Sequence, residues 1–404
     1  MPRLTLLLLL TLAATGCPHW PENQPLSRPL RPSQGYRFEN LALGPRNSNR
    51  VLVVLSFSGG GTRAGAMAYG VLKAMTETPI ADGTRTLADE IDVISASSGG
   101  AFAAAYYGAF GPQTFVREFP DRVLKVDLGM GTFWRGTLCP YNLVRLCSPW
   151  FNRSDLAAEL YEDTIYGPWT YAHLSFRGRP YVVLNATDLQ AGTRFEFTQD
   201  QFDHLGSSVE QIPIARAVAA SAAFPVLLTP VALRDYSAAE GYRHLVDGGV
   251  VDNMGLGYVV DAYERGALHD LIQTGEVETV VFVVVNARNR TSEAMTASPQ
   301  APGAASVLAY GLSAAIDRRD DDQLQHLAEL CRRGEDLPDG GSVPDVSFLE
   351  VALDDLPDPR LRDRLLDVET TFGLEPEVVD ELAAASARLL RQHPAFARLC
   401  ERLR

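Results

Sequence analysis

The sequence lacks an excess of positive charge and any apolar run long enough to cross a bilayer as a helix. Its 36 Lys and Arg residues are outnumbered by 50 Asp and Glu residues, which gives a formal net charge of −14. Nucleic acid binds to basic surfaces, so this balance argues against nucleic acid as a partner. With 404 residues, 46% of them hydrophobic, the chain is long enough to bury a large core, which excludes a disordered protein.

The apolar run at residues 4–14 is short, because a membrane-spanning helix needs about 20 apolar residues. Arg3 precedes it and small residues follow, which favours a cleaved secretory signal peptide over residues 1–16 rather than a spanning anchor. The sequence ATGC at 14–17 resembles the lipobox of bacterial lipoproteins, although Ala14 replaces the usual leucine. We therefore expect a lipid on Cys17 and a membrane-anchored protein of the cell envelope, on its periplasmic or outer-membrane side, or otherwise a secreted one.

Cysteine is scarce, and no pair has the CxxC spacing of a zinc site, so we expect no metal. Four cysteines remain after Cys17 in a compartment that permits disulfides. Cys139 and Cys147 are close in sequence, so we predict that they pair, which leaves Cys331 and Cys400 for each other. The alternative is four free buried thiols.

Apolar segments alternate with segments of helical spacing along most of the chain, which predicts an α/β protein. Because near-continuous apolar strands need cover on both faces, we expect a three-layer α/β/α sandwich around a mainly parallel sheet. We place a proline-rich tether at 17–48 and one domain at 49–404, with its core at 51–290, a loop at 290–305 and a C-terminal addition at 303–404. Expected strands start at 51, 91, 181, 244, 277 and 346, and expected helices cover 64–75, 98–107, 214–220, 256–265, 307–333 and 376–393.

The first of these strands ends in Gly59, Gly60 and Gly61. Backbone amides at such a loop, at the start of a helix, favour a negative charge, either a bound phosphate or the oxyanion of acyl transfer. The loop lacks the endings of the nucleotide-binding motifs. A purely structural tight turn remains the alternative.

The second glycine-rich turn is SASSGG at 95–100, between a strand and an alanine-rich helix. It is similar to the nucleophile elbow G-x-S-x-G, with Ser95 in place of the first glycine and Ser97 as the central serine. The alternative is that Ser97 or Ser98 only caps the following helix.

A serine nucleophile needs a group that accepts its proton. Among seven histidines only His244 is close to another candidate, Asp247, and in an extended strand these two side chains would point to opposite faces. Asp247 stands at a strand end before two glycines, where its carboxylate could reach across the edge of the sheet. A simple Asp-Gly turn is the alternative.

The ordered set of GGGTR, SASSGG, AVAASAAFPVLLTP and DGGVVDN resembles the patatin-like phospholipases, over about residues 51–286. The stretch NATDLQAGTRFEF also resembles the strand pair that this family has between nucleophile and aspartate. The resemblance implies an α/β/α sandwich that hydrolyses acyl esters of lipids with a serine/aspartate dyad, without catalytic histidine or cofactor. Ser95 and Ala64 depart from the family pattern, which usually has glycine at both positions.

Carried over by position, the resemblance implies Ser97 as nucleophile, Asp247 as proton acceptor and the loop Gly59–Gly60–Gly61–Thr62–Arg63 as the oxyanion hole. The expected substrate is a phospholipid or another acyl-ester lipid. Two other functions stay open: an esterase or thioesterase acting on other acyl groups, and an inactive lipoprotein that binds lipid or a partner in its cleft.

Overall fold

The computed structural model describes residues 23–403, apart from 226, 239–240, 291–303 and 334–343. The expected signal peptide at 1–16, the lipid on Cys17 and most of the expected loop at 290–305 lie outside the described residues.

A single eight-stranded sheet forms the centre of the described chain, in the order β10-β9-β1-β4-β5-β8-β7, with β6 paired to β5. The first five strands of this order are parallel, whereas β8 runs antiparallel to β5 and β7 antiparallel to β8. The strands are β1 (Val51–Phe57), β4 (Ile91–Ser97), β5 (Tyr181–Asp188), β6 (Thr193–Glu196), β7 (Val231–Asp235), β8 (Gly241–Asp247), β9 (Thr279–Asn286) and β10 (Asp345–Ala352). A separate two-stranded sheet joins β2 (Pro79–Ile80) to β3 (Arg85–Thr86).

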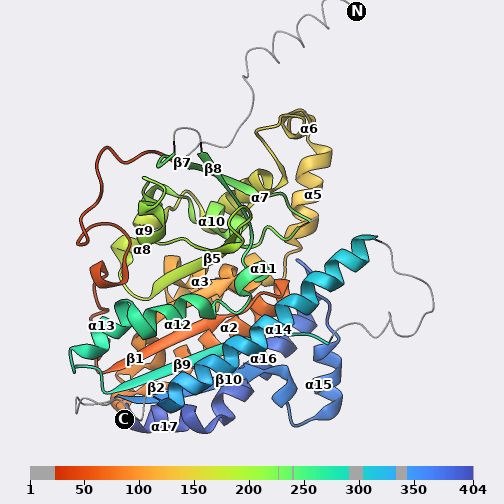
Figure 1. Ribbon diagram of the computed structural model, residues 1–404. Coiled ribbons are helices and arrows are strands. Elements are labelled where there is room, and N and C mark those ends of the chain that lie inside the picture. Colours follow the sequence, from red (N-terminus) through yellow and green to blue (C-terminus); the bar gives the residue numbers. More distant parts are fainter. Residues whose placement is uncertain (1–22, 226, 239–240, 291–303, 334–343, 404) are drawn as a thin grey trace, which may run out of the picture.

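Helices cover both faces of the sheet, which confirms the three-layer α/β/α sandwich (Figure 1). On one face lie α2 (Gly61–Glu77), α3 (Gly99–Phe110) and α16 (Pro376–Gln392), and on the other α12 (Leu256–Arg265) and α14 (Ala304–Arg333). Every residue of β1, β4, β5 and β9 is buried, as sheets covered on both faces require. The other helices are α4 (Pro112–Phe119), α5 (Leu128–Leu138), α6 (Pro140–Leu146), α7 (Arg153–Tyr161), α8 (Tyr171–Arg177), α9 (Gln199–Asp203), α10 (Ile214–Ser221), α11 (Gly249–Asp252), α13 (Ala267–Gln273), α15 (Pro359–Leu366) and α17 (Pro394–Arg402).

The described part of the N-terminal segment, from residue 23 on, packs against the domain, whereas the sequence predicted a loosely packed tether at 17–48. Tyr36 is fully buried, and its hydroxyl donates to the carbonyl of Val182 on β5 and accepts the amide of the same residue. Asn23 is also buried and hydrogen-bonds to Ser207. Apolar aromatic burial offsets the cost of ordering a proline-rich chain, so the described part of this segment belongs to the domain.

The predicted disulfides are wrong, because Cys139, Cys147, Cys331 and Cys400 are all free thiols. Cys139 and Cys147 flank helix α6 at its two ends. A helix rises about 1.5 Å per residue, so about 12 Å separates the two cysteines, which is beyond the Cα separation that a disulfide tolerates. The pairing had been predicted from closeness in sequence, and the intervening helix removes that basis.

Helix α2, which begins in the glycine loop, lies very close to α16. A Cβ atom on Gly70 would be 2.1 Å from the carbonyl oxygen of Ala383 and 2.2 Å from Oγ of Ser386. The Ser386 hydroxyl also donates to the carbonyl of Met67 on α2 at 3.0 Å. The C-terminal addition is therefore packed onto the helix that carries the loop.

We predict that Gly70→Ala lowers the free energy of unfolding by about 1–3 kcal/mol, because the added methyl group forces α2 and α16 apart. The matched control is Gly311→Ala in α14, where no atom lies within 4 Å of the added Cβ and the side is exposed. At this position the change to alanine should raise the free energy of unfolding by about 0.5–1 kcal/mol, because alanine has a higher helix propensity than glycine. Urea denaturation of both variants measures the difference, and equal effects would contradict the close α2–α16 contact.

Candidate active site

The turn between β4 and α3 forms a strained elbow at Ser98. This residue has φ 49° and ψ −120°, a conformation that residues with a side chain rarely adopt. The elbow can form because a Cβ on Gly99 would be only 2.0 Å from the carbonyl oxygen of Gly61, and a Cβ on Gly100 2.7 Å from that of Ser58. Glycine is thus required on the C-terminal side of Ser98, as in a nucleophile elbow.

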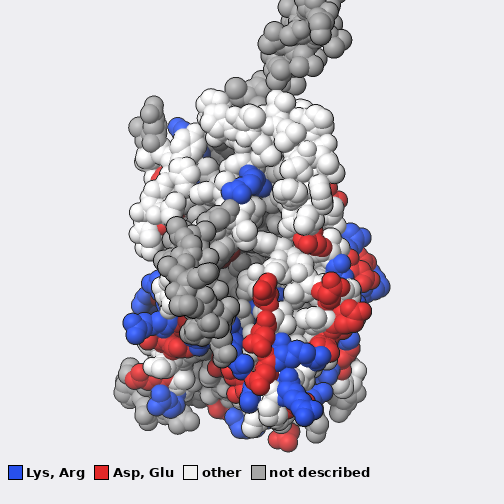
Figure 2. Space-filling model, turned by 90° about the vertical axis from the view of Figure 1, so that its right-hand side faces the viewer, with Lys and Arg blue, Asp and Glu red and all other residues white. Residues whose placement is uncertain are grey.

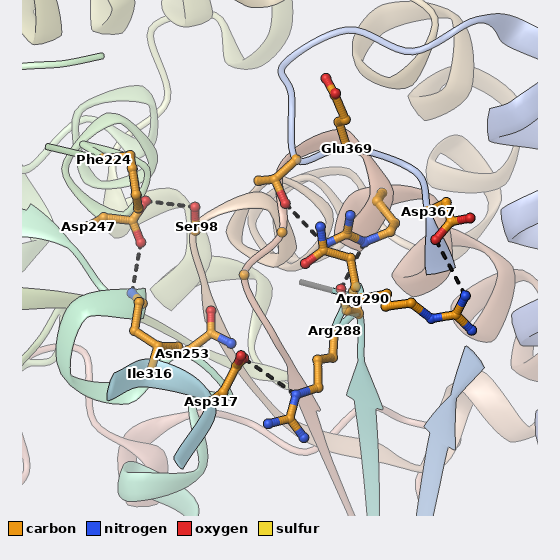
Figure 3. A pocket seen from close by; sticks show the side chains of 17 residues that line it. Ser98, Phe224, Asp247, Asn253, Arg288, Arg290, Ile316, Asp317, Asp367 and Glu369 are labelled. Atoms are coloured by element: carbon orange, nitrogen blue, oxygen red, sulfur yellow. Dashed lines mark hydrogen bonds and ion pairs between the residues drawn. The ribbon is translucent and has the colours of Figure 1, made fainter. Parts of the chain in front are cut away.

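The serine beside Asp247 is Ser98 and not Ser97, which corrects the sequence prediction. Oγ of Ser98 donates to Oδ2 of Asp247 at 2.7 Å (Figure 3). Oγ of Ser97 is fully buried and donates instead to the carbonyl of Asp252 at 2.6 Å. The elbow is therefore Ala96-Ser97-Ser98-Gly99-Gly100, so Ala96 and not Ser95 stands in place of the first glycine of the motif.

The carboxylate of Asp247 stands at the end of β8, two strands away from Ser98 in the sheet. Its Oδ1 accepts the amide of Gly249 at 2.7 Å, which leaves Oδ2 directed to Ser98. Burial raises the pKa of Asp247 to about 6, although the hydrogen bonds from Ser98 and Gly249 lower it. The arrangement gives a carboxylate with a raised proton affinity in contact with a serine hydroxyl.

The glycine loop lies against the elbow. A Cβ on Gly59 would be 3.2 Å from Cβ of Ser98 and 2.5 Å from Oδ1 of Asn253, so no side chain fits there. The amide of Gly59 donates to the carbonyl of Asn253, and that of Thr62 to the carbonyl of Thr371, each at 2.8 Å. Within the described residues, no acceptor is found for the amides of Gly60 and Gly61. These two amides, at the N-terminus of α2, are the donors of the loop that remain for a ligand.

Arg63 holds the loop in place from behind. Its side chain is 2% exposed, and its Nε donates to the carbonyl of Ala287 at 2.8 Å. The guanidinium group also donates to the carbonyl of Val368 and, at 3.1 Å, to the hydroxyl of Thr370. Burial lowers the pKa of Arg63 to about 10. Its donors are thus bound to protein oxygens, and the C-terminal segment 368–371 becomes a support of the glycine loop.

A second set of polar side chains fixes the elbow and the loop that follows Asp247. The amide of Ser98 donates to Oγ of Ser221 at 3.0 Å, and Ser221 donates to the carbonyl of Asn185 at 2.6 Å. The side chain of Asn185 in turn donates to Oγ of Ser95 at 3.0 Å. Hydroxyl groups on β1 and β4 donate to three carbonyl groups of the segment after Asp247: Ser97 to that of Asp252, Ser56 to that of Met254 and Ser95 to that of Gly255.

Ser98 and Asp247 open into a cavity of about 660 Å³ at the carboxyl ends of β1, β4 and β9. Figure 3 shows both side chains on one side of it, opposite Arg288, Arg290, Asp367 and Glu369. Arg288 forms an ion pair with Asp317 on α14, and Arg290 one with Asp367. The volume of the cavity is typical of small-molecule sites, and part of the cavity wall comes from the C-terminal addition.

Neither a histidine nor a metal cluster is found at this site in the described residues. His244 hydrogen-bonds to Gln190 through its ring and its amide, and not to Asp247. Over the same part of the chain, no group of three or more His, Cys, Asp or Glu side chains is arranged to hold a metal ion.

Sequence reasoning missed Ser98 and the supporting residues Asn185, Ser221 and Asn253. For Ser98 the local sequence gave no decisive signal, because both serines have a glycine two positions later, Gly99 after Ser97 and Gly100 after Ser98. Asn253 stands in the quoted stretch DGGVVDN, and its side chain donates to the buried carboxylate of Asp320 at 2.7 Å. Burial raises the pKa of Asp320 to about 7. Nothing in the local sequence indicated the role of the segment 368–371.

Several solved structures resemble the fold. Human GIVD cytosolic phospholipase A2 in complex with methyl gamma-linolenyl fluorophosphonate is 14% identical, with a TM-score of 0.48 over 88% of this chain and 59% of that chain. A second structure of the same human enzyme is 13% identical, with a TM-score of 0.48 over 88% of this chain and 60% of that one. VipD from Legionella pneumophila is 14% identical, with a TM-score of 0.32 over 85% of this chain and 67% of that chain.

The chain thus spans about three fifths of the length of the human enzyme. No curated protein matches the sequence. The sequence profile of the patatin-like phospholipases matches residues 55–260, which is about half of the chain and contains the glycine loop, the elbow and Asp247. By this match, and in agreement with the elbow and the layered fold, the chain belongs to the patatin-like phospholipase family.

Proposed function

We propose that the protein hydrolyses acyl esters of lipids with Ser98 as nucleophile and Asp247 as general base. The observation that carries this proposal is the 2.7 Å hydrogen bond between Oγ of Ser98 and Oδ2 of Asp247 at a strained elbow beside the glycine loop. A hydroxyl is a weak nucleophile until a base accepts its proton, and this contact supplies that base without a histidine. Membership of the family supports a lipid substrate.

In the first half of the reaction, Oγ of Ser98 attacks the ester carbonyl carbon while its proton moves to Oδ2 of Asp247. The carbonyl π bond opens and its electron pair forms an oxyanion. When the tetrahedral adduct collapses, the bond to the leaving oxygen breaks, and the proton on Asp247 passes to that oxygen to release an alcohol. In the second half, water loses a proton to Asp247 and attacks the acyl carbon. The bond from that carbon to Oγ of Ser98 then breaks, the proton on Asp247 returns to Oγ, and the fatty acid leaves.

We assign the oxyanion hole to the amides of Gly60 and Gly61. The expected hole covered residues 59–63, but the amides of Gly59 and Thr62 donate to carbonyl groups of the protein, as does the guanidinium of Arg63. Preorganised amide donors of this kind lower the barrier by about 3–4 kcal/mol each. Thr62 and Arg63 act by holding the loop against the segment 368–371.

On the basis of the family, a phospholipid or lysophospholipid is the proposed substrate, and a non-phospholipid ester or thioester is the alternative. Assays with a panel of phospholipids, neutral esters and thioesters distinguish these two. The alternative of an inactive lipid-binding protein rested on the missing first glycine of the elbow, and in the corrected frame Ala96 holds that position. Labelling of Ser98 by a fluorophosphonate distinguishes this alternative, because a protein that only binds lipid would not react. For location, we propose that Cys17 carries a lipid anchor that keeps the enzyme at a membrane of the cell envelope.

The two neighbouring serines test the nucleophile. We expect Ser98→Ala to lower kcat for p-nitrophenyl esters by about 10³-fold or more, because the nucleophile is lost. Ser97→Ala is the matched control at the adjacent residue. It should keep most activity but lower the free energy of unfolding by about 1–3 kcal/mol, because the buried carbonyl of Asp252 loses its donor. Loss of turnover in Ser97→Ala, with a folded protein and an active Ser98→Ala, would overturn the assignment.

The pH dependence tests the base. With the pKa of Asp247 raised to about 6, its carboxyl is protonated below that pH and cannot accept the proton of Ser98. We expect kcat/KM for a soluble ester to fall about tenfold per pH unit on the acid side and to level off above about pH 6. The control is Asp320→Asn, because the pKa of this second buried carboxyl is raised to about 7. An acid limb that disappears in Asp320→Asn would assign the titration to Asp320 and contradict the proposal.

A further inference from the structure

Helix α5 shows its large apolar side chains to the solvent. Its exposed residues Met130, Phe133, Trp134 and Leu138 have the spacing of one helical stripe, and their exposed fractions range from 47% to 71%. The residues that α5 buries are Leu128, Thr132 and Gly136. A helix on a globular protein normally turns its apolar stripe to the core, so the orientation of α5 is the reverse of the usual one.

Helix α6 and the residues after it extend this exposed surface. We call it the apolar cap, and it consists of Met130, Phe133, Trp134, Leu138, Tyr141, Leu143, Val144 and Trp150. Monomeric proteins seldom expose a contiguous apolar patch of this kind without a function for it.

The two helices of the cap are joined to each other, and α5 packs on the body through its small residues. The side chain of Asn142 on α6 donates to the carbonyl of Arg135 on α5 at 3.0 Å. A Cβ on Gly136 would be 3.2 Å from Cδ2 of Leu156 on α7, so α5 approaches the domain on its small side. The large side chains of α5 are therefore exposed because the helix packs on the domain with its small residues.

Charge is nearly absent from the cap. Residues 126–152 contain only Asp127, Arg135 and Arg145 as charged side chains. Asp127 caps α5 through the amide of Met130, Arg135 pairs with Asp163, and Arg145 pairs with Glu159. Figure 2 shows the consequence: the upper part of this face, at the height of α5 and α6, is almost free of charged side chains, whereas the lower part carries many of both signs.

The cap adjoins the candidate active site. The amide of Leu128, at the start of α5, donates to the carbonyl of Phe372 at 3.2 Å, and the carbonyl of the neighbouring Thr371 holds the glycine loop at Thr62. Phe224 lines the cavity, and Leu227, three residues further on, is 55% exposed. A lipid that reaches the cap is thus close to Ser98.

The N-terminal segment enters the domain at the same end of the molecule. Asn23 hydrogen-bonds to Arg234 on β7, which lies at the upper end of the molecule together with α5 and α6 (Figure 1). Cys17 precedes Asn23 by six positions in the sequence. Even a fully extended chain of this length spans only about 20 Å, so a lipid on Cys17 would keep this end close to a membrane.

We propose that the apolar cap inserts into the interfacial region of a lipid bilayer and presents the cavity to ester lipids there. Trp, Tyr and Leu side chains on an uncharged surface are typical of proteins that lie in this region, and uncharged surfaces avoid the cost of desolvating ions. Within the described residues, none of the helices has the length and apolar character for a bilayer crossing. The role of this docking rests on the proposed function, lipid hydrolysis. The test of docking itself measures membrane binding and does not require turnover.

The first experiment measures how deeply the tryptophan side chains of the cap insert into a bilayer. Full-length protein carrying Ser98→Ala, which removes the nucleophile, and Trp20→Phe, which removes the tryptophan next to Cys17, is mixed with vesicles of phosphatidylcholine that has brominated acyl chains, and tryptophan quenching is recorded. We expect quenching that is largely lost when Trp134 and Trp150 are both replaced by Phe. Trp169→Phe is the matched control, since Trp169 is also exposed, at 44%, but lies outside the cap. Quenching that persists without the two cap tryptophans would overturn the proposal, whatever the enzyme hydrolyses.

The second experiment compares turnover of phosphatidylcholine vesicles with turnover of a soluble p-nitrophenyl ester in the full-length enzyme. We expect the double change Trp134→Glu and Leu138→Glu to lower the ratio of the two rates by about tenfold or more. Phe176→Glu is the control, because Phe176 is 89% exposed and belongs to α8, a helix that lies on the left in Figure 1 whereas α5 lies on the right. An equal fall in both variants, or a cap that forms a dimer and fails to bind vesicles, would contradict bilayer docking. Absence of ester turnover in the native enzyme would refute the proposed function and leave the quenching result intact.

Discussion

The site depends on one hydrogen bond, between Ser98 and Asp247, residues that are 149 positions apart. Strand β5 lies between the strands that carry them, so the two side chains meet only above the carboxyl edge of the sheet. The elbow raises Ser98 to that level through a positive φ, and two glycines after it allow α3 to approach the glycine loop closely. A small shift of any of these three parts would separate the hydroxyl from the carboxylate.

Buried polar side chains hold these parts in register. Asn185 and Ser221 connect β5 to the backbone of the elbow, and hydroxyl groups from β1 and β4 bind the carbonyl groups that follow Asp247. Ser97 belongs to this set, which explains a second serine next to the proposed nucleophile. Each of these contacts satisfies a buried backbone group that would otherwise be costly to leave unpaired. The polar network therefore gives the site its geometry as well as part of the stability of the sheet.

The sequence was sufficient for the layered fold and for the position of the glycine loop and Asp247 beside the serine turn, because these follow from apolar strands and from local motifs. It was not sufficient to choose between Ser97 and Ser98, since SASSGG contains two overlapping frames and the choice depends on contacts of Gly99 and Gly100 with the distant glycine loop. The partners of Arg63 are also distant, with Val368 lying 305 positions away. The expected disulfides failed for a similar reason: closeness in sequence did not include the helix that separates Cys139 from Cys147.

The central claim is that Ser98 attacks the substrate while the amides of Gly60 and Gly61 hold the oxyanion. A crystal structure of the enzyme after reaction with an alkyl fluorophosphonate tests it most directly. The account predicts a covalent bond from phosphorus to Oγ of Ser98, with the phosphonyl oxygen about 2.7–3.1 Å from both amide nitrogens. An adduct on Ser97, or a phosphonyl oxygen directed away from the glycine loop, would contradict it.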